Sequence, residues 1–128
     1  MPKETLSKLH DVAIPLYGIN LLVAVCPDAA REFDPYMDLH PDCSAEVYVF
    51  HHGERRHAYI GVVFENVNAA DANTVAHEAV HAAWRTLEWV GIKATVDNQE
   101  ALAYLVGWVA QEITDFVTPH RKAKRKKK

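Results

Sequence analysis

The chain has 128 residues, 49% hydrophobic and 24% charged, a globular composition that can enclose one modest core but not two. Residues 119–128 hold seven of the 14 Lys and Arg, which leaves seven basic against 17 acidic side chains elsewhere, a difference of −10. Because nucleic-acid-binding domains need basic groups clustered on a folded face, this distribution argues against that class.

The N-terminus and the two cysteines bear on where the protein works. The first residues lack the basic region, apolar run and small-residue cleavage site of a signal peptide, and no run of about 18 apolar residues follows. Cys26 and Cys43 are too few for a disulfide framework and lack CxxC spacing. We therefore expect a cytoplasmic protein with free thiols and no membrane partner.

The first half of the chain predicts strands and a loop. The apolar run 19–26, closed by Pro27, is typical of a buried strand. Three prolines between Pro27 and Ser44 predict a long loop. Residues 46–50 and 57–64 are rich in Val, Tyr, Ile and Phe and flank a polar stretch, as in a hairpin. Together these segments predict a sheet of about three strands.

The second half predicts two long helices, because apolar residues recur there at steps of three and four. Asp71 is the expected N-cap of the first helix and Gly91 its expected stop. The second helix should begin near Asp97 and end at Thr118, since Pro119 follows. We expect an α+β domain in which a small, mostly antiparallel sheet packs on these two helices.

The last ten residues differ in composition from the rest. Residues 119–128 carry seven basic side chains and no acid, as is typical of a solvated, disordered segment. We therefore assign residues 1–118 to one folded domain and expect 119–128 to be a disordered basic tail. Such a tail would make at most weak contact with polyanions.

The first predicted helix carries the motif HExxH, as His77-Glu78-Ala79-Val80-His81. Residues four apart lie on one face of a helix, so both imidazoles can reach one metal ion. Glu78 projects about 100° away around the axis, beside the open side of that metal. The alternative is that exposed histidines coincide with the motif by chance.

Glu100 is the candidate for a third ligand, because zinc in hydrolytic sites usually takes three protein groups and leaves one position to water. It follows His81 after eighteen residues and lies on a helix face with Tyr104, outside the apolar stripe. If residues 91–96 are extended, they can return roughly 20 Å along the first helix. We therefore expect Glu100 to lie level with His81.

The motif, the eighteen-residue gap and the following Glu resemble the gluzincin family of zinc peptidases. The resemblance covers about residues 57–110, and Asn98-Gln99-Glu100-Ala101 is similar to the family's Asn-Glu-Ala signature with one residue inserted. The pattern also resembles small metallopeptidase-like proteins encoded by phages, which implies a bacterial or phage-infected cell. Residues 1–118 would then form a minimal zincin-like domain.

The resemblance implies a peptidase in which His77, His81 and Glu100 hold Zn²⁺. Glu78 would be the general base that takes a proton from the attacking water and passes it to the leaving amine. Strand 57–64 would be the edge of the sheet that pairs with an extended peptide or protein substrate.

Two departures from the family concern supporting residues. Thermolysin-like members have an Asp four residues after the ligand Glu, where this chain has Tyr104. Tyr104 could accept a hydrogen bond from His77 or donate one to the oxyanion, so we include it among the catalytic candidates. We expect almost nothing after the second helix in place of the C-terminal domain of larger family members, so His120 is the other available donor.

Other functions remain open at this point. The main alternative is a zinc-stabilised binding protein, such as a phage factor that engages a host protein or nucleic acid, with little turnover. Hydrolysis of another amide is a third possibility. His51, His52 and His57 could form a second metal site around the hairpin turn, although solvated histidines are the simpler interpretation.

Overall fold

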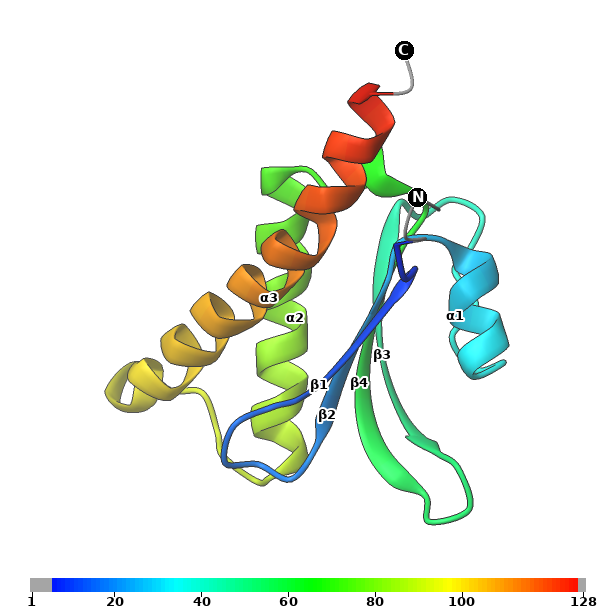
Figure 1. Ribbon diagram of the computed structural model, residues 1–128. Helices are drawn as coiled ribbons and strands as arrows, with labels where there is room; N and C mark the ends of the chain where they lie inside the picture. Colours follow the sequence, from blue (N-terminus) through cyan, green and yellow to red (C-terminus); the bar gives the residue numbers. More distant parts are fainter. Residues whose placement is uncertain (1–5, 127–128) are drawn as a thin grey trace.

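The computed structural model describes the backbone of residues 6–126 and the side chains of residues 6–123. It confirms the predicted α+β class: a four-stranded mixed sheet is packed against helices on both faces (Figure 1). The strands are β1 (Leu9–Ala13), β2 (Asn20–Ala24), β3 (Ala45–His52) and β4 (His57–Phe64). The helices are α1 (Pro27–Phe33), α2 (Ala72–Trp89) and α3 (Gln99–Lys126), with short 3₁₀ turns η1 (Val67–Ala69) and η2 (Val96–Asn98).

The sheet has the order β1-β2-β4-β3. β1 with β2 and β3 with β4 are antiparallel, whereas β2 with β4 is parallel. β4 therefore lies inside the sheet and β3 lies at its edge. The expectation that strand 57–64 forms the open edge is wrong, because β2 pairs with β4 and covers that side.

Alternating side chains of the strands supply two cores. On one face α2 and α3 cover a large cluster that includes Leu21, Val62 and Phe64. On the other face α1 covers a smaller cluster that includes Phe50 and Tyr59. Figure 1 shows the two long helices on one side of the sheet and α1 on the other. No helix in the described part of the chain is long and apolar enough to cross a bilayer.

Both ends of α2 are fixed by its predicted caps. Asp71 accepts a hydrogen bond from the backbone N–H of Thr74 at 2.8 Å, as an N-cap does. At the other end Gly91 has φ +79°, a left-handed conformation that glycine adopts without a steric penalty. The helix begins and ends as its sequence predicts, and His77 and His81 share one of its faces.

Three local predictions are wrong. The segment 27–44 is not all loop, since Pro27 starts α1 at a position where proline needs no N–H partner. Residues 9–13 form a fourth strand that the sequence did not indicate. Finally, α3 does not end at Thr118.

The segment predicted as a disordered tail is helical as far as Lys126, with Pro119 inside the helix. Contacts beyond the proline hold the helix in place: the ring of His120 lies 5.2 Å from that of Phe116, and its Nε2 donates to the carbonyl of Ser7 at 2.8 Å. Residues 127–128, the end of the predicted tail, lie outside the described residues.

Candidate metal centre

The two histidines of the motif lie side by side on the exposed side of α2. Their Nε2 atoms are 3.2 Å apart and their ring centroids 4.8 Å apart. Two nitrogens bound at 2.0–2.1 Å to one tetrahedral zinc lie about 3.4 Å apart. His77 and His81 therefore fit as two ligands of one zinc ion without a change of backbone.

Glu78 lies on the side of α2 that faces the sheet and is only 5% exposed. Its Oε1 is 3.9 Å from Nε2 of His77, while its Oε2 is buried and has no hydrogen-bond partner in the structure described. Burial raises the pKa of this carboxyl, against the opposing influence of His77 and His81. A buried carboxyl without a partner is costly in a folded protein and is often a functional group.

A cavity of about 310 Å³ opens between α2 and the start of β3. His77, Glu78, His81 and Arg85 line it from the helix, and the first residues of the edge strand, Ala45, Glu46 and Val47, line it from the sheet. The motif residues thus share one concave site with the backbone of an edge strand. Such a site can hold a ligand between the helix and the strand.

Among the described residues, β4 is the one strand that pairs with β3, so the other side of β3 is an open edge. The backbone N–H of Glu65 donates to the carbonyl of Ser44, one register step before Ala45 pairs with Phe64. Because bonded pairs alternate along an antiparallel ladder, the odd-numbered residues of β3 direct their N–H and C=O away from β4. Val47, which lines the cavity, is one of these residues.

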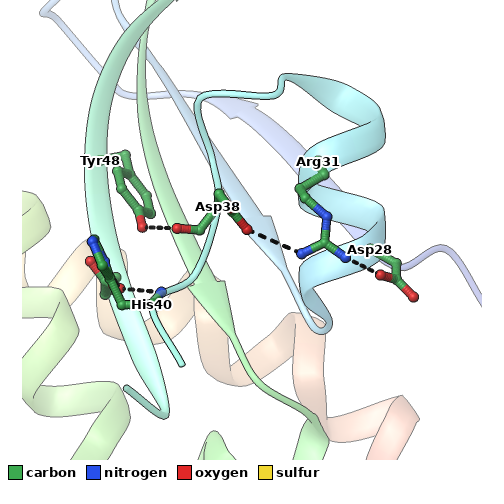
Figure 2. A network of polar contacts seen from close by, with 6 residues as sticks. Asp28, Arg31, Asp38, His40 and Tyr48 are labelled. Atoms are coloured by element: carbon green, nitrogen blue, oxygen red, sulfur yellow. Dashed lines mark hydrogen bonds and ion pairs between the residues drawn. The ribbon is translucent and has the colours of Figure 1, made fainter. Parts of the chain in front are cut away.

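A polar network holds the segment that leads into β3 (Figure 2). Glu46 accepts hydrogen bonds from the backbone N–H of His40 at 2.7 Å and from its ring at 2.6 Å. Although burial opposes the effect, these bonds lower the pKa of Glu46. Tyr48 donates to the carbonyl of Asp38, whose carboxylate accepts from Arg31 at 3.2 Å. The network fixes the strand residues that form one wall of the cavity.

Glu100 is not brought to the histidine pair. It is exposed in the first turn of α3, and no group of three or more His, Cys, Asp or Glu side chains able to hold a metal exists among the described residues. The expectation that Glu100 lies level with His81 stays a prediction, and among the described residues Glu100 forms no metal-binding group with the histidine pair. The histidine pair fits zinc, but the third ligand that the resemblance implies is not in place.

The connection between the helices explains this difference. From His81, α2 continues about 12 Å to its end at 1.5 Å per residue, and residues 91–98 are not extended throughout, as the return along α2 would require. Instead the N–H of Ile92 bonds to the carbonyl of Leu87, and the side chain of Asn98 bonds to the carbonyl of Lys93. These bonds and η2 shorten the connection, and α3 starts to one side of the C-terminal half of α2 (Figure 1).

The supporting residues expected at the site lie elsewhere. Tyr104 is 82% exposed, four residues after Glu100 and so on the same outward face of α3. Its predicted hydrogen bond with His77 is not formed; the ring nitrogen of His77 lies against His81. His120 contacts Ser7, as described above, and so does not face the histidine pair.

The other histidines and the cysteines form no second metal group among the described residues. His52 lies 3.1 Å from Asp34, His57 lies 2.9 Å from Asn20, and the ring of His51 lies beside Trp89. They are thus divided among three different contacts. Cys26 and Cys43 are free thiols, as expected.

Two features of the cavity escaped the sequence analysis. Arg85 lies four residues after His81, so the same spacing that places His77 and His81 on one helix face also predicts Arg85 on that face. The second feature is the edge strand, which the continuous apolar run of β4 could have indicated: strands buried on both faces have such runs. Comparisons with protein-family models, with curated proteins and with solved structures give no match.

Proposed function

We propose that this protein is a zinc-dependent peptidase in which His77 and His81 bind the metal and Glu78 acts as the general base. The observation that carries the proposal is the 3.2 Å separation of the two Nε2 atoms, with the buried carboxyl of Glu78 in the same cavity. Zinc would supply a Lewis acid that polarises the scissile carbonyl and makes water more acidic.

Glu78 performs the proton transfers in this proposal. A carboxylate oxygen without a hydrogen-bond partner can accept a proton from the attacking water. As the carbon–nitrogen bond breaks, Glu78 returns that proton to the leaving amine, so the base is regenerated. Its burial keeps bulk water from competing for the same oxygen.

The edge strand supports a peptide as the substrate. An extended peptide can pair with the outward N–H and C=O groups of Val47 and its odd-numbered neighbours, which places its backbone along the cavity. The histidine pair lies on the opposite wall, so a paired peptide bond would lie within the same cavity. We further propose a cytoplasmic location in a bacterial or phage-infected cell, as the phage resemblance implies.

Glu100 as a third zinc ligand stays a prediction of the family resemblance. It would require the first turns of α3 to move toward the histidine pair. Without this movement, a zinc ion held by the two imidazoles would still keep positions for water and substrate.

Metal content and peptide cleavage test the proposal together. After dialysis, the wild type should retain zinc and His81→Ala should lose it, whereas Glu78→Gln should keep zinc and lose cleavage of a mixed peptide library. Absence of zinc from the wild type, even after zinc is supplied, would remove the basis of the proposal. Equal cleavage by wild type and Glu78→Gln would show that another group is the base.

A further inference from the structure

Arg85 lines the same cavity as the histidine pair, one helical turn beyond His81. From this juxtaposition we propose that Arg85 binds a carboxylate of the substrate, so that the enzyme selects peptides with an Asp or Glu side chain about two residues before the scissile bond. The inference rests on the proposed peptidase function and adds a substrate class to it.

The cavity wall holds one guanidinium together with the carboxyls of Glu46 and Glu78. Among its lining residues Arg85 carries the one permanent positive charge. Its guanidinium lies 3.0 Å from the carboxylate of Glu88, an ion pair in which both side chains are about half exposed or more. Exposed pairs of this kind are weak, and a guanidinium has further N–H groups that match a carboxylate in a bidentate arrangement. A substrate carboxylate can therefore replace or join Glu88.

The distance along the helix gives the position of that carboxylate. Arg85 follows His81 by four residues, which is about 6 Å along α2 at 1.5 Å per residue. An extended peptide covers the same length in about two residues at 3.3 Å each. The acidic side chain should therefore be about two residues from the bond held at the histidine pair.

The direction follows from how β3 and α2 run. The start of β3, at Ala45–Val47, lies beside His77 and His81, and the end of β3 lies beside the end of α2, where the ring of His51 is 5.1 Å from that of Trp89. Both elements therefore pass the site in the same direction.

A peptide that pairs antiparallel to β3, the more stable arrangement, runs the opposite way. Its residues before the scissile bond then lie beside Arg85. A substrate's C-terminal carboxylate would reach Arg85 only in the parallel arrangement, so the two sources of a carboxylate can be told apart.

The test uses peptides matched in all but one group. A peptide that the zinc-loaded protein cleaves is made with Glu or Gln two residues before the cleaved bond, each with a free or amidated C-terminus. We expect the Glu peptide to have a kcat/KM about tenfold higher, mainly through a lower KM, as charged hydrogen bonds of this kind give. Arg85→Gln should bring the Glu-to-Gln ratio close to one, and Arg85→Glu should shift the preference to Lys.

Arg55→Gln is the matched control, because Arg55 is exposed in the turn between β3 and β4, away from the cavity. It should keep the wild-type ratio. Equal cleavage of Glu and Gln peptides by the wild type would overturn the inference and leave the peptidase proposal intact. A preference that follows the free C-terminus, or that survives in Arg85→Gln, would overturn it as well.

A binding measurement separates this inference from the failure of the proposed function. Zinc-loaded Glu78→Gln should bind a fluorescent Glu peptide more tightly than its Gln partner by anisotropy, and the difference should disappear when Arg85→Gln is added. If no peptide is cleaved but this difference is present, the peptidase proposal fails and the carboxylate site stands. If the difference is absent, the carboxylate site fails.

Discussion

Nε2 of His77 lies 3.2 Å from Nε2 of His81, one turn later on α2. This separation is set by the helix itself, because residues four apart share a face. The helix thus brings the two imidazoles together by itself, and little reorganisation is needed for metal binding.

Removal of either imidazole should weaken zinc binding at this site. Since two ligands come from the chain, His77→Ala or His81→Ala leaves one, and zinc affinity should fall by at least about 10-fold. Isothermal titration with zinc measures the change. His57→Ala is the control, because His57 contacts Asn20 and is absent from the cavity lining. An equal loss in His57→Ala would place the metal elsewhere.

Glu78→Gln should keep the zinc affinity of the wild type and reduce kcat by about 10²–10⁴, the range of general-base catalysis. The amide has the shape of the carboxyl but cannot take the proton. The free energy of unfolding of the metal-free protein should not fall, since the substitution removes a buried carboxylate with an unpartnered oxygen. Urea unfolding checks the fold beside the kinetic measurement.

Glu100→Gln and Tyr104→Phe should leave zinc binding close to that of the wild type, because both residues lie on the outward face of α3. The same titration that shows the loss in His81→Ala provides the comparison. If Glu100→Gln loses zinc as completely as His81→Ala, the first turns of α3 must close over the pair when metal binds. The third ligand implied by the family resemblance would then be restored.

Val47→Pro should raise KM for peptides and leave zinc binding unchanged. Proline removes an N–H that points away from the sheet, a loss that an edge strand tolerates. Tyr48→Pro, one residue further on, removes an N–H that bonds to β4 and should lower the free energy of unfolding instead. A wild-type KM in a folded Val47→Pro protein would argue against pairing of the substrate with β3.

Tyr59 should make the protein sensitive to alkali. Burial, together with its hydrogen bond to Asp11 at 2.8 Å, raises the pKa of Tyr59 to about 12, from 10.0. Between these two pH values the folded state keeps a proton that the unfolded state loses. The contribution of Tyr59 to the free energy of unfolding is therefore complete below pH 10 and disappears as the pH rises to about 12. The pKa of Tyr48 is likewise raised to about 12, chiefly by burial, and adds to this loss.

The decrease in the free energy of unfolding from Tyr59 should be on the order of 1–3 kcal/mol. Tyr59→Phe should make this alkaline decrease smaller, as measured by denaturant unfolding at several pH values. Tyr36→Phe, at a tyrosine that is 63% exposed, should leave the profile unchanged. The same profile in Tyr59→Phe and wild type would assign the alkaline transition to other groups.

The parts of the site that sequence could predict are local. Asp71 and Gly91 specify the ends of α2, and the spacing of His77 and His81 then fixes their shared face. The position of Glu100 depended instead on the path of residues 90–98, which follows from bonds such as that of Ile92 to Leu87. A spacing in sequence could not specify that path.

The order of the strands in the sheet likewise depends on pairing between segments that are distant in the sequence. β2 bypasses its neighbour in sequence, β3, and pairs with β4, so the edge strand could not be assigned from the hairpin alone. The prediction that the second helix ends before Pro119 was wrong for a related reason. Proline locally disfavours continuation of a helix. Here contacts of His120 with Phe116 and Ser7 hold the helix beyond Pro119.

The histidine pair comes from a single helix, and this limits what zinc can do for stability. A metal held by His77 and His81 closes a loop of only a few residues and joins no two elements of the fold, so it removes little entropy from the unfolded chain. A helical segment in a partly unfolded chain presents the same two nitrogens, and binding to that state reduces the stabilisation further. A chelator should therefore remove the activity at a temperature where the protein stays folded. This is the behaviour of a catalytic metal rather than of a structural one.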